Sequence, residues 1–121
     1  MDPKLVALRF NECISNRDVV GLGKLMTEDY VFIDSEGNIS ESKKFMIGSW
    51  TKFFEMFPLY RNTFERVESH ENIAVILGFA YWSEENDHDP SIWTATIVDD
   101  LISEWRIYHD TEETRKKFGF I

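Results

Sequence analysis

The order in which helix and strand patterns follow one another constrains this fold more than any single motif. Three early stretches have apolar residues at helical spacing, at about 3–15, 19–26 and 41–57. One short strand pattern, 30–33, lies among them. Four later stretches have strand character: 61–69, 73–83, 91–98 and 101–109. Helices followed by strands predict an α+β domain, with helices packed on one face of an antiparallel sheet.

Local signals mark where several of these elements begin and end. Asp2-Pro3 and Asp18 are typical of helix starts, and Ser40 is expected to cap the third helix. Pro58 is expected to stop that helix. Asp99-Asp100, between two strand patterns, predicts a tight hairpin, and residues 111–117 predict a short helical tail.

The length and the aromatic content of the chain indicate how many domains it forms and what its interior holds. The 121 residues fit a single domain, 1–121, and aromatic residues make up 15% of them. Long consecutive hairpins twist and curl, so a curled sheet closed by helices would form a cone with one open mouth. The surplus of aromatic residues would then line a cavity or cover a subunit interface.

Charge excludes several classes of partner. The formal net charge is -9, which argues against binding to nucleic acid and to anionic membrane surfaces. No stretch approaches the ~18 consecutive apolar residues of a membrane span. The first residues lack the apolar core of a signal peptide, so a cytoplasmic protein is expected. A small hydrophobic ligand remains the favoured partner.

Asp34 is the first candidate catalytic residue. It follows the strand pattern 30–33 and precedes the turn sequence 35–38. A carboxylate at the rim of an apolar cavity is expected to have a raised pKa and to transfer protons. Alternatively, Asp34 is a turn aspartate that accepts hydrogen bonds from nearby backbone amides.

The last strand supplies the second candidate, His109. Strand alternation places Leu101, Ser103, Trp105, Ile107 and His109 on one face, which we assign to the cavity because it is the more apolar. His109 would lie at the mouth, near Asp34, with an imidazole suited to proton transfer. The alternative is a histidine hydrogen-bonded at a strand end.

Other side chains point to packing rather than to a metal or cofactor. Trp50 and Phe54 lie one turn apart on the third helix and belong to the core, to the pocket wall or to both. The acidic segment 84–89 lacks the spacing of a calcium loop, so we expect a solvated loop. His70 and His88 lack the spaced partners of a zinc site, and no phosphate-binding loop occurs. We therefore expect no metal and no cofactor.

Four motifs, taken in order, resemble a known family. They are Asn16-Arg17-Asp18, the segment 29–34 with Gly37, the segment 50–58 and the segment 102–111. Their arrangement is similar to that of the nuclear transport factor 2 superfamily, in its SnoaL-like and ketosteroid-isomerase-like branch. The resemblance implies a cone-shaped, cystatin-like fold with three N-terminal helices on a strongly curved antiparallel sheet. It also implies a deep pocket and a homodimer through the sheet.

The catalytic positions of the family match only in part. Asp34 falls where ketosteroid isomerase carries its base, but Phe10 replaces the tyrosine that stabilises the oxyanion, and the second donor falls near Ile92 or Trp93. Steroid isomerisation is therefore disfavoured. Ile107 falls where limonene epoxide hydrolases carry an acid, which disfavours that activity too. SnoaL-like cyclases use a late acid, for which Asp110 is a possible equivalent, so either His109 or Asp110 would face the pocket.

The resulting hypothesis is a SnoaL-like pocket protein for a small hydrophobic molecule. As an enzyme it would be a cofactor-free isomerase, cyclase or dehydratase acting on a hydrophobic carbonyl compound, with Asp34 transferring the proton and His109 assisting. The predicted pocket residues are Phe10, Trp50, Phe54 and Trp105. The alternative is a non-catalytic ligand-binding or dimeric interaction domain. Catalysis would require a titratable group in an enclosed cavity.

Overall fold

The computed structural model describes residues 2–83 and 88–120. The elements follow one another as α1 (Pro3–Ser15), α2 (Val19–Lys24), β1 (Met26–Ile33), β2 (Ile39–Glu41), α3 (Lys43–Met56), β3 (Arg61–His70), β4 (Ile73–Tyr81), β5 (His88–Val98), β6 (Leu101–His109) and α4 (Glu112–Lys117). No helix among the described residues is both long and apolar enough to cross a membrane. The predicted α+β class is confirmed, with the helices and strands in the predicted order apart from β2.

The strands form one curved sheet in the order β2-β1-β6-β5-β4-β3. Strands β3 to β6 are joined as consecutive antiparallel hairpins. Strand β1 pairs parallel to β6, so the expectation of a purely antiparallel sheet is wrong at this one pairing. The expected set of three leading helices is also interrupted, because β1 and β2 lie between α2 and α3.

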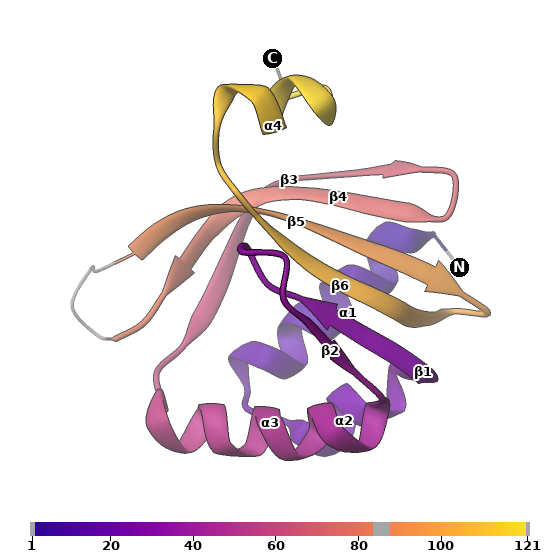
Figure 1. Ribbon diagram of the computed structural model, residues 1–121, viewed down its shortest axis with the longest axis vertical. Helices are drawn as coiled ribbons and strands as arrows, with labels where there is room; N and C mark the ends of the chain where they lie inside the picture. The colour runs from indigo at the N-terminus through magenta and orange to yellow at the C-terminus, as the bar shows by residue number, and fades with distance from the viewer. Residues whose placement is uncertain (1, 84–87, 121) are drawn as a thin grey trace.

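The helices divide between the two faces of the sheet. Figure 1 shows α1, α2 and α3 on the concave side of the sheet and α4 on the opposite side. Helix α1 packs across β3 to β6, whereas α3 packs against β1 and β2. The main core lies between these helices and the sheet. A cone results, with α3 along one side of its interior.

Capping side chains explain where the helices start. The carboxylates of Asp2 and Asp18 accept hydrogen bonds from the backbone of Lys4 and Gly21, as predicted. Helix α3 starts later than predicted, because Ser42 and not Ser40 caps it. Ser40 instead pairs with Phe32 in the short β2–β1 ladder.

Strand β6 departs from strict alternation. Its pairing with β5 shifts by one residue between Ile102 and Glu104, which is the signature of a β-bulge. Ile102 is consequently fully buried in the main core together with Trp105. Strict alternation from Trp105 would place Ile102 on the other face, which is wrong, while Trp105 lies inside as predicted. The predicted Asp99-Asp100 hairpin is confirmed, with both residues at positive φ.

The C-terminal segment covers part of the outer face of the sheet. Phe120 is buried with Val75, Leu77 and Ile92 in a small second core. These strand residues alternate with residues of the main core, so they point away from α1 and α3. The C-terminal segment thus covers apolar side chains on the outer face of the sheet. The homodimer through the sheet stays a prediction.

Candidate functional site

The interior of the cone holds an aromatic cavity of about 300 Å³, which we call the inner chamber. This volume lies at the lower end of the roughly 300–1,000 Å³ found for small-molecule sites. Six of its lining residues are aromatic. The full lining is Phe32, Ser40, Met46, Ser49, Trp50, Phe53, Tyr60, Asn62, Trp82, Trp105 and Ile107.

Two elements supply most of the wall. Helix α3 presents Met46, Ser49, Trp50 and Phe53, whose i, i+3, i+4 and i+7 spacing places them on one face. Strand β6 presents Trp105 and Ile107, two residues apart, and so on one side of the strand. The chamber therefore lies between the apolar stripe of α3 and the inward face of the sheet.

The predicted pocket residues separate into two sets. Trp50 and Trp105 line the chamber, but Phe10 and Phe54 do not. Phe10 is 0% exposed and its ring lies 4.8 Å from that of Trp105, while Phe54 stacks on Trp50 at 5.3 Å. Both are therefore packing residues that contact the tryptophans of the wall and do not line the open space themselves.

Among the described residues, the chamber is lined by neutral polar groups and by no charged ones. Tyr60 is the only ionisable residue in this described lining, and burial raises its pKa, although a hydrogen bond with Asn62 partly opposes the rise. Asn62 is 6% exposed, and its Oδ1 has no hydrogen-bond partner among the described residues. Its backbone oxygen accepts a hydrogen bond from Asn11 at 3.1 Å. Neither residue was predicted from the sequence, in which the only signal was a polar residue, Asn62, within the strand pattern 61–69.

A second cavity of about 510 Å³, which we call the outer hollow, adjoins the chamber. Tyr60, Trp82 and Ile107 line both cavities. The outer hollow is also lined by three carboxylates, a histidine and smaller or apolar side chains: Asp34, Ser35, Ala80, Asp89, Pro90, Ser91, Trp93, Tyr108, His109 and Asp110. Neither cavity has a lysine or arginine among its described lining residues.

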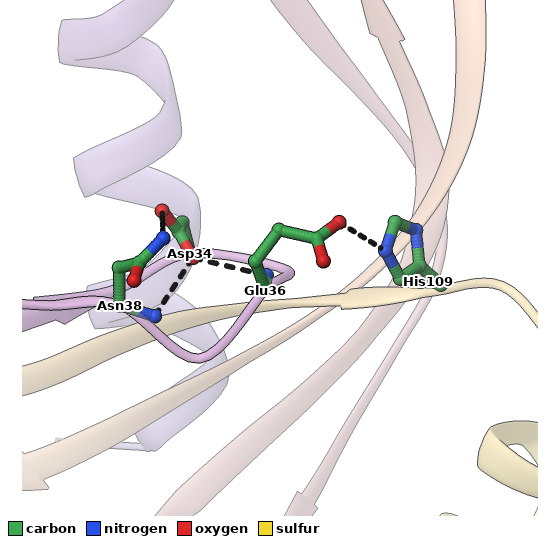
Figure 2. A network of polar contacts seen from close by, with 4 residues as sticks. All are labelled: Asp34, Glu36, Asn38 and His109. Atoms are coloured by element: carbon green, nitrogen blue, oxygen red, sulfur yellow. Dashed lines mark hydrogen bonds and ion pairs between the residues drawn. The ribbon is translucent and has the colours of Figure 1, made fainter.

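Asp34 occupies the turn between β1 and β2 (Figure 2). Its carboxylate accepts hydrogen bonds from the backbone N–H groups of Glu36 and Asn38, each at 2.9 Å, and from the Asn38 side chain at 3.1 Å. These bonds, with the Asn38 backbone contributing most, lower the pKa of Asp34. The expected rise in pKa is therefore wrong, because the turn itself supplies donors that stabilise the ionised form.

His109 and Asp110 both line the outer hollow, so both of the alternative residues face this cavity. His109 contacts Glu36 at 3.1 Å, and not Asp34, and its side chain is 62% exposed (Figure 2). The Asp110 carboxylate is 7% exposed and binds Arg115 through two bonds of 2.6 and 2.7 Å. The hydrogen bond with Arg115 is the main reason why the pKa of Asp110 is lowered. Asp110 therefore serves first to hold the C-terminal segment.

Trp82 belongs to the wall shared by the two cavities, a role that its sequence neighbourhood did not indicate. Its ring packs edgewise on Phe57 at 5.2 Å and on Tyr60 at 4.9 Å, and its N–H donates to Asp89 at 3.1 Å. Asp89 belongs to β5, which starts earlier than predicted because residues 88–90 pair with β4. The rest of the predicted acidic loop, 84–87, lies outside the described residues. Elsewhere in the chain, no group of three possible metal ligands was found.

Comparison with known proteins identifies the fold. No family model matches the sequence, and no curated protein matches it. A solved cystatin-fold protein of Novosphingobium aromaticivorans superposes with a TM-score of 0.81 at 12% identity, over 90% of this chain and 99% of its own.

Two further solved structures carry names that suggest an activity. A putative SnoaL-like polyketide cyclase of Shewanella denitrificans gives 0.79 at 14% identity, over 98% of each chain. An epoxide hydrolase of M. tuberculosis, similar to limonene epoxide hydrolase, gives 0.77 at 12% identity, over 89% of this chain and 82% of its own. The predicted resemblance is thus confirmed at the level of architecture: the chain has the cone-shaped, cystatin-like fold of SnoaL-like and nuclear transport factor 2-like proteins.

Proposed function

We propose that this protein binds a small, largely apolar organic molecule in the inner chamber. The observation that carries the proposal is the lining of the chamber, in which aromatic residues are the largest group and no charged side chain occurs within residues 2–83 and 88–120. Apolar walls with a few neutral hydrogen-bonding groups are typical of small-molecule sites. Such a wall favours burial of an uncharged hydrocarbon or aromatic body and penalises burial of a charge.

The polar groups of the chamber suggest how the ligand would be oriented. Tyr60 immediately precedes β3, Asn62 is the second residue of that strand, and both line the chamber. Because the buried Asn62 Oδ1 has no hydrogen-bond partner among the described residues, a donor from the ligand would be favoured there. The Tyr60 hydroxyl would stay protonated and could donate to a carbonyl or hydroxyl oxygen.

The test uses N-phenyl-1-naphthylamine, a neutral dye whose fluorescence rises in apolar surroundings. We expect saturable binding of one dye per chain. Ser49→Phe, which fills the chamber from α3, should reduce the affinity at least about tenfold, equivalent to ~1.4 kcal/mol. Ile107→Trp fills it independently from β6, and circular dichroism checks that each variant is folded.

Gly48→Ala is the matched control, because it adds a methyl group next to Ser49 where open space surrounds the new carbon. The control should bind the dye as the parent protein does. Absence of saturable binding, or equal affinity in both filled variants and the control, would overturn the proposal.

A second candidate is acid/base catalysis by Asp34 and His109, as an isomerase, cyclase or dehydratase of a carbonyl compound. One observation favours it: both side chains line the outer hollow, beside the chamber in which the substrate body would be held. The lowered pKa of Asp34 makes it a weak base and so opposes this candidate. A screen of enolisable carbonyl compounds tests it, because Asp34→Asn should abolish any turnover found. Unchanged turnover would remove Asp34 from the mechanism.

A further inference from the structure

We infer that the ligand carries a protonated amine, held where the inner chamber opens into the outer hollow. The ligand class is then an organic ammonium compound with an apolar body. This inference rests on the proposed function, because the apolar body must first bind in the chamber. It adds the charge and the orientation of the ligand.

The charge of the outer hollow is the first argument. Asp34 and Asp89 line it, and the partners described above for these two carboxylates are neutral: backbone and side-chain amides for Asp34, and the Trp82 indole for Asp89. Neutral donors stabilise a carboxylate without cancelling its charge. Asp110 differs, because Arg115 neutralises it. At least two negative charges thus face the hollow, within a chain of net charge -9.

The aromatic residues at the junction are the second argument. Tyr60 and Trp82 line both cavities, with ring centroids 4.9 Å apart. The π-face of an aromatic ring attracts an ammonium group, with tryptophan the strongest. An amine at this junction would therefore meet aromatic rings on the chamber side and carboxylates on the hollow side.

The third argument is independent of the carboxylates. Asn62 lines the chamber, is more than nine-tenths buried, and its Oδ1 has no hydrogen-bond partner among the described residues. An unpaired buried acceptor is costly, and an ammonium group brings up to three donors. An anionic ligand would bring none, and His109 is the only described lining residue that could become positive to meet it. Carboxylates, phosphates and sulfates are therefore disfavoured.

Three probes that share a naphthalene ring test the inference by calorimetry at pH 7 and low salt. They are 1-naphthylmethylamine, 1-naphthylmethanol and the carboxylate anion of 1-naphthylacetic acid. The amine is positive, the alcohol neutral and the acetate negative under these conditions. We expect the amine to bind about tenfold more tightly than the alcohol, and the acetate more weakly than either. Added sodium chloride should reduce the advantage of the amine, because salt screens the carboxylates.

A second experiment removes two of the negative charges that line the outer hollow. In the double variant Asp34→Asn/Asp89→Asn the amine and the alcohol should bind within about twofold of each other, because the two carboxylate charges are gone. Glu12→Gln is the control, since it removes one charge from the exposed side of α1, and no residue of α1 lines either cavity among the described residues. It should preserve the tenfold preference.

The outcomes separate the two proposals. Equal binding of amine and alcohol by the parent protein would refute the ammonium inference and leave the proposed function standing. A preference that survives in the double variant would also refute it, because the charge would then not come from these carboxylates. If neither the naphthalene probes nor the neutral dye bind, the proposed function itself fails.

Discussion

Replacement of Trp82 by alanine should reduce both the stability of the protein and its affinity for the ligand. The Trp82 ring packs on other aromatic rings and also belongs to the wall shared by the inner chamber and the outer hollow. Its ring packs edgewise on Phe53, Phe57 and Tyr60 with centroid separations of 5.9, 5.2 and 4.9 Å. Truncation of a buried tryptophan costs about 3–5 kcal/mol. Trp82 is only half-buried, so we expect about 2–3 kcal/mol, which lowers Tm by roughly 10 °C in a chain of this length.

The consequence for binding follows from the position of the ring. Trp82 is one of three residues that line both cavities, so we expect Trp82→Ala to join the inner chamber to the outer hollow and to remove one aromatic wall from the ligand. We expect the affinity for N-phenyl-1-naphthylamine to fall about tenfold, equivalent to ~1.4 kcal/mol. Trp82→Phe should retain most of that affinity and cost about 1 kcal/mol of stability, because it keeps a ring and loses the hydrogen bond to Asp89.

Urea unfolding followed by circular dichroism measures the stability, and dye titration measures the binding. Phe45→Ala is the control, since this aromatic residue of α3 is 56% exposed and lines neither cavity. It should change stability by less than about 0.5 kcal/mol. If Trp82→Ala were as stable as the control and bound the dye like the parent protein, Trp82 would not be the part of the shared wall that we describe.

Four further substitutions test the stability of the fold. Gly48→Ala should stabilise the protein by about 0.5–1 kcal/mol, because open space surrounds the added carbon on α3. The same change at Gly78 should destabilise it by about 1–3 kcal/mol, because the new carbon would overlap a β3 backbone oxygen. Urea unfolding measures the free energy of unfolding of both variants, and changes of the same sign would contradict the packing described here. Asp110→Asn should destabilise the protein at pH 7, where the carboxylate with the lowered pKa is ionised and paired with Arg115. That difference should fade as pH falls below about 4, since the parent protein then also loses the ion pair, whereas a difference independent of pH would refute the explanation. Phe120→Ala should cost about 2 kcal/mol and speed amide hydrogen exchange in 112–120, and unchanged exchange there would show that this ring does not anchor the segment.

Elements with local causes could be predicted from the sequence. Asp2 and Asp18 cap helices because each side chain reaches a backbone N–H only two or three residues away. The Asp99-Asp100 hairpin likewise depends on the conformation of two adjacent residues. Such interactions are complete within a few residues of sequence, so their pattern is sufficient to place them.

Features that depend on distant partners could not be placed in this way. Strand β2 has three residues and little strand character of its own, and it exists because β1 offers it a partner. The bulge in β6 is a property of its pairing with β5 and moves Ile102 to the core side. A strict alternation of faces assumes that register is constant, which a single bulge invalidates.

The properties of Asp34 show why the candidate site was harder to predict than the fold. The sequence places this carboxylate correctly, after a strand and before a turn, but its pKa depends on where three N–H groups point once the turn has formed. The same uncertainty applies to the ligand. Whether a cavity in this fold favours a neutral or a charged molecule depends on which side chains meet at its opening. Here Tyr60 and Trp82, 22 residues apart in the sequence, line the outer hollow together with Asp34 and Asp89. A neutral chamber beside an acidic opening is thus a product of tertiary packing, and the preference for an ammonium group that we infer from it would disappear if either half were changed alone.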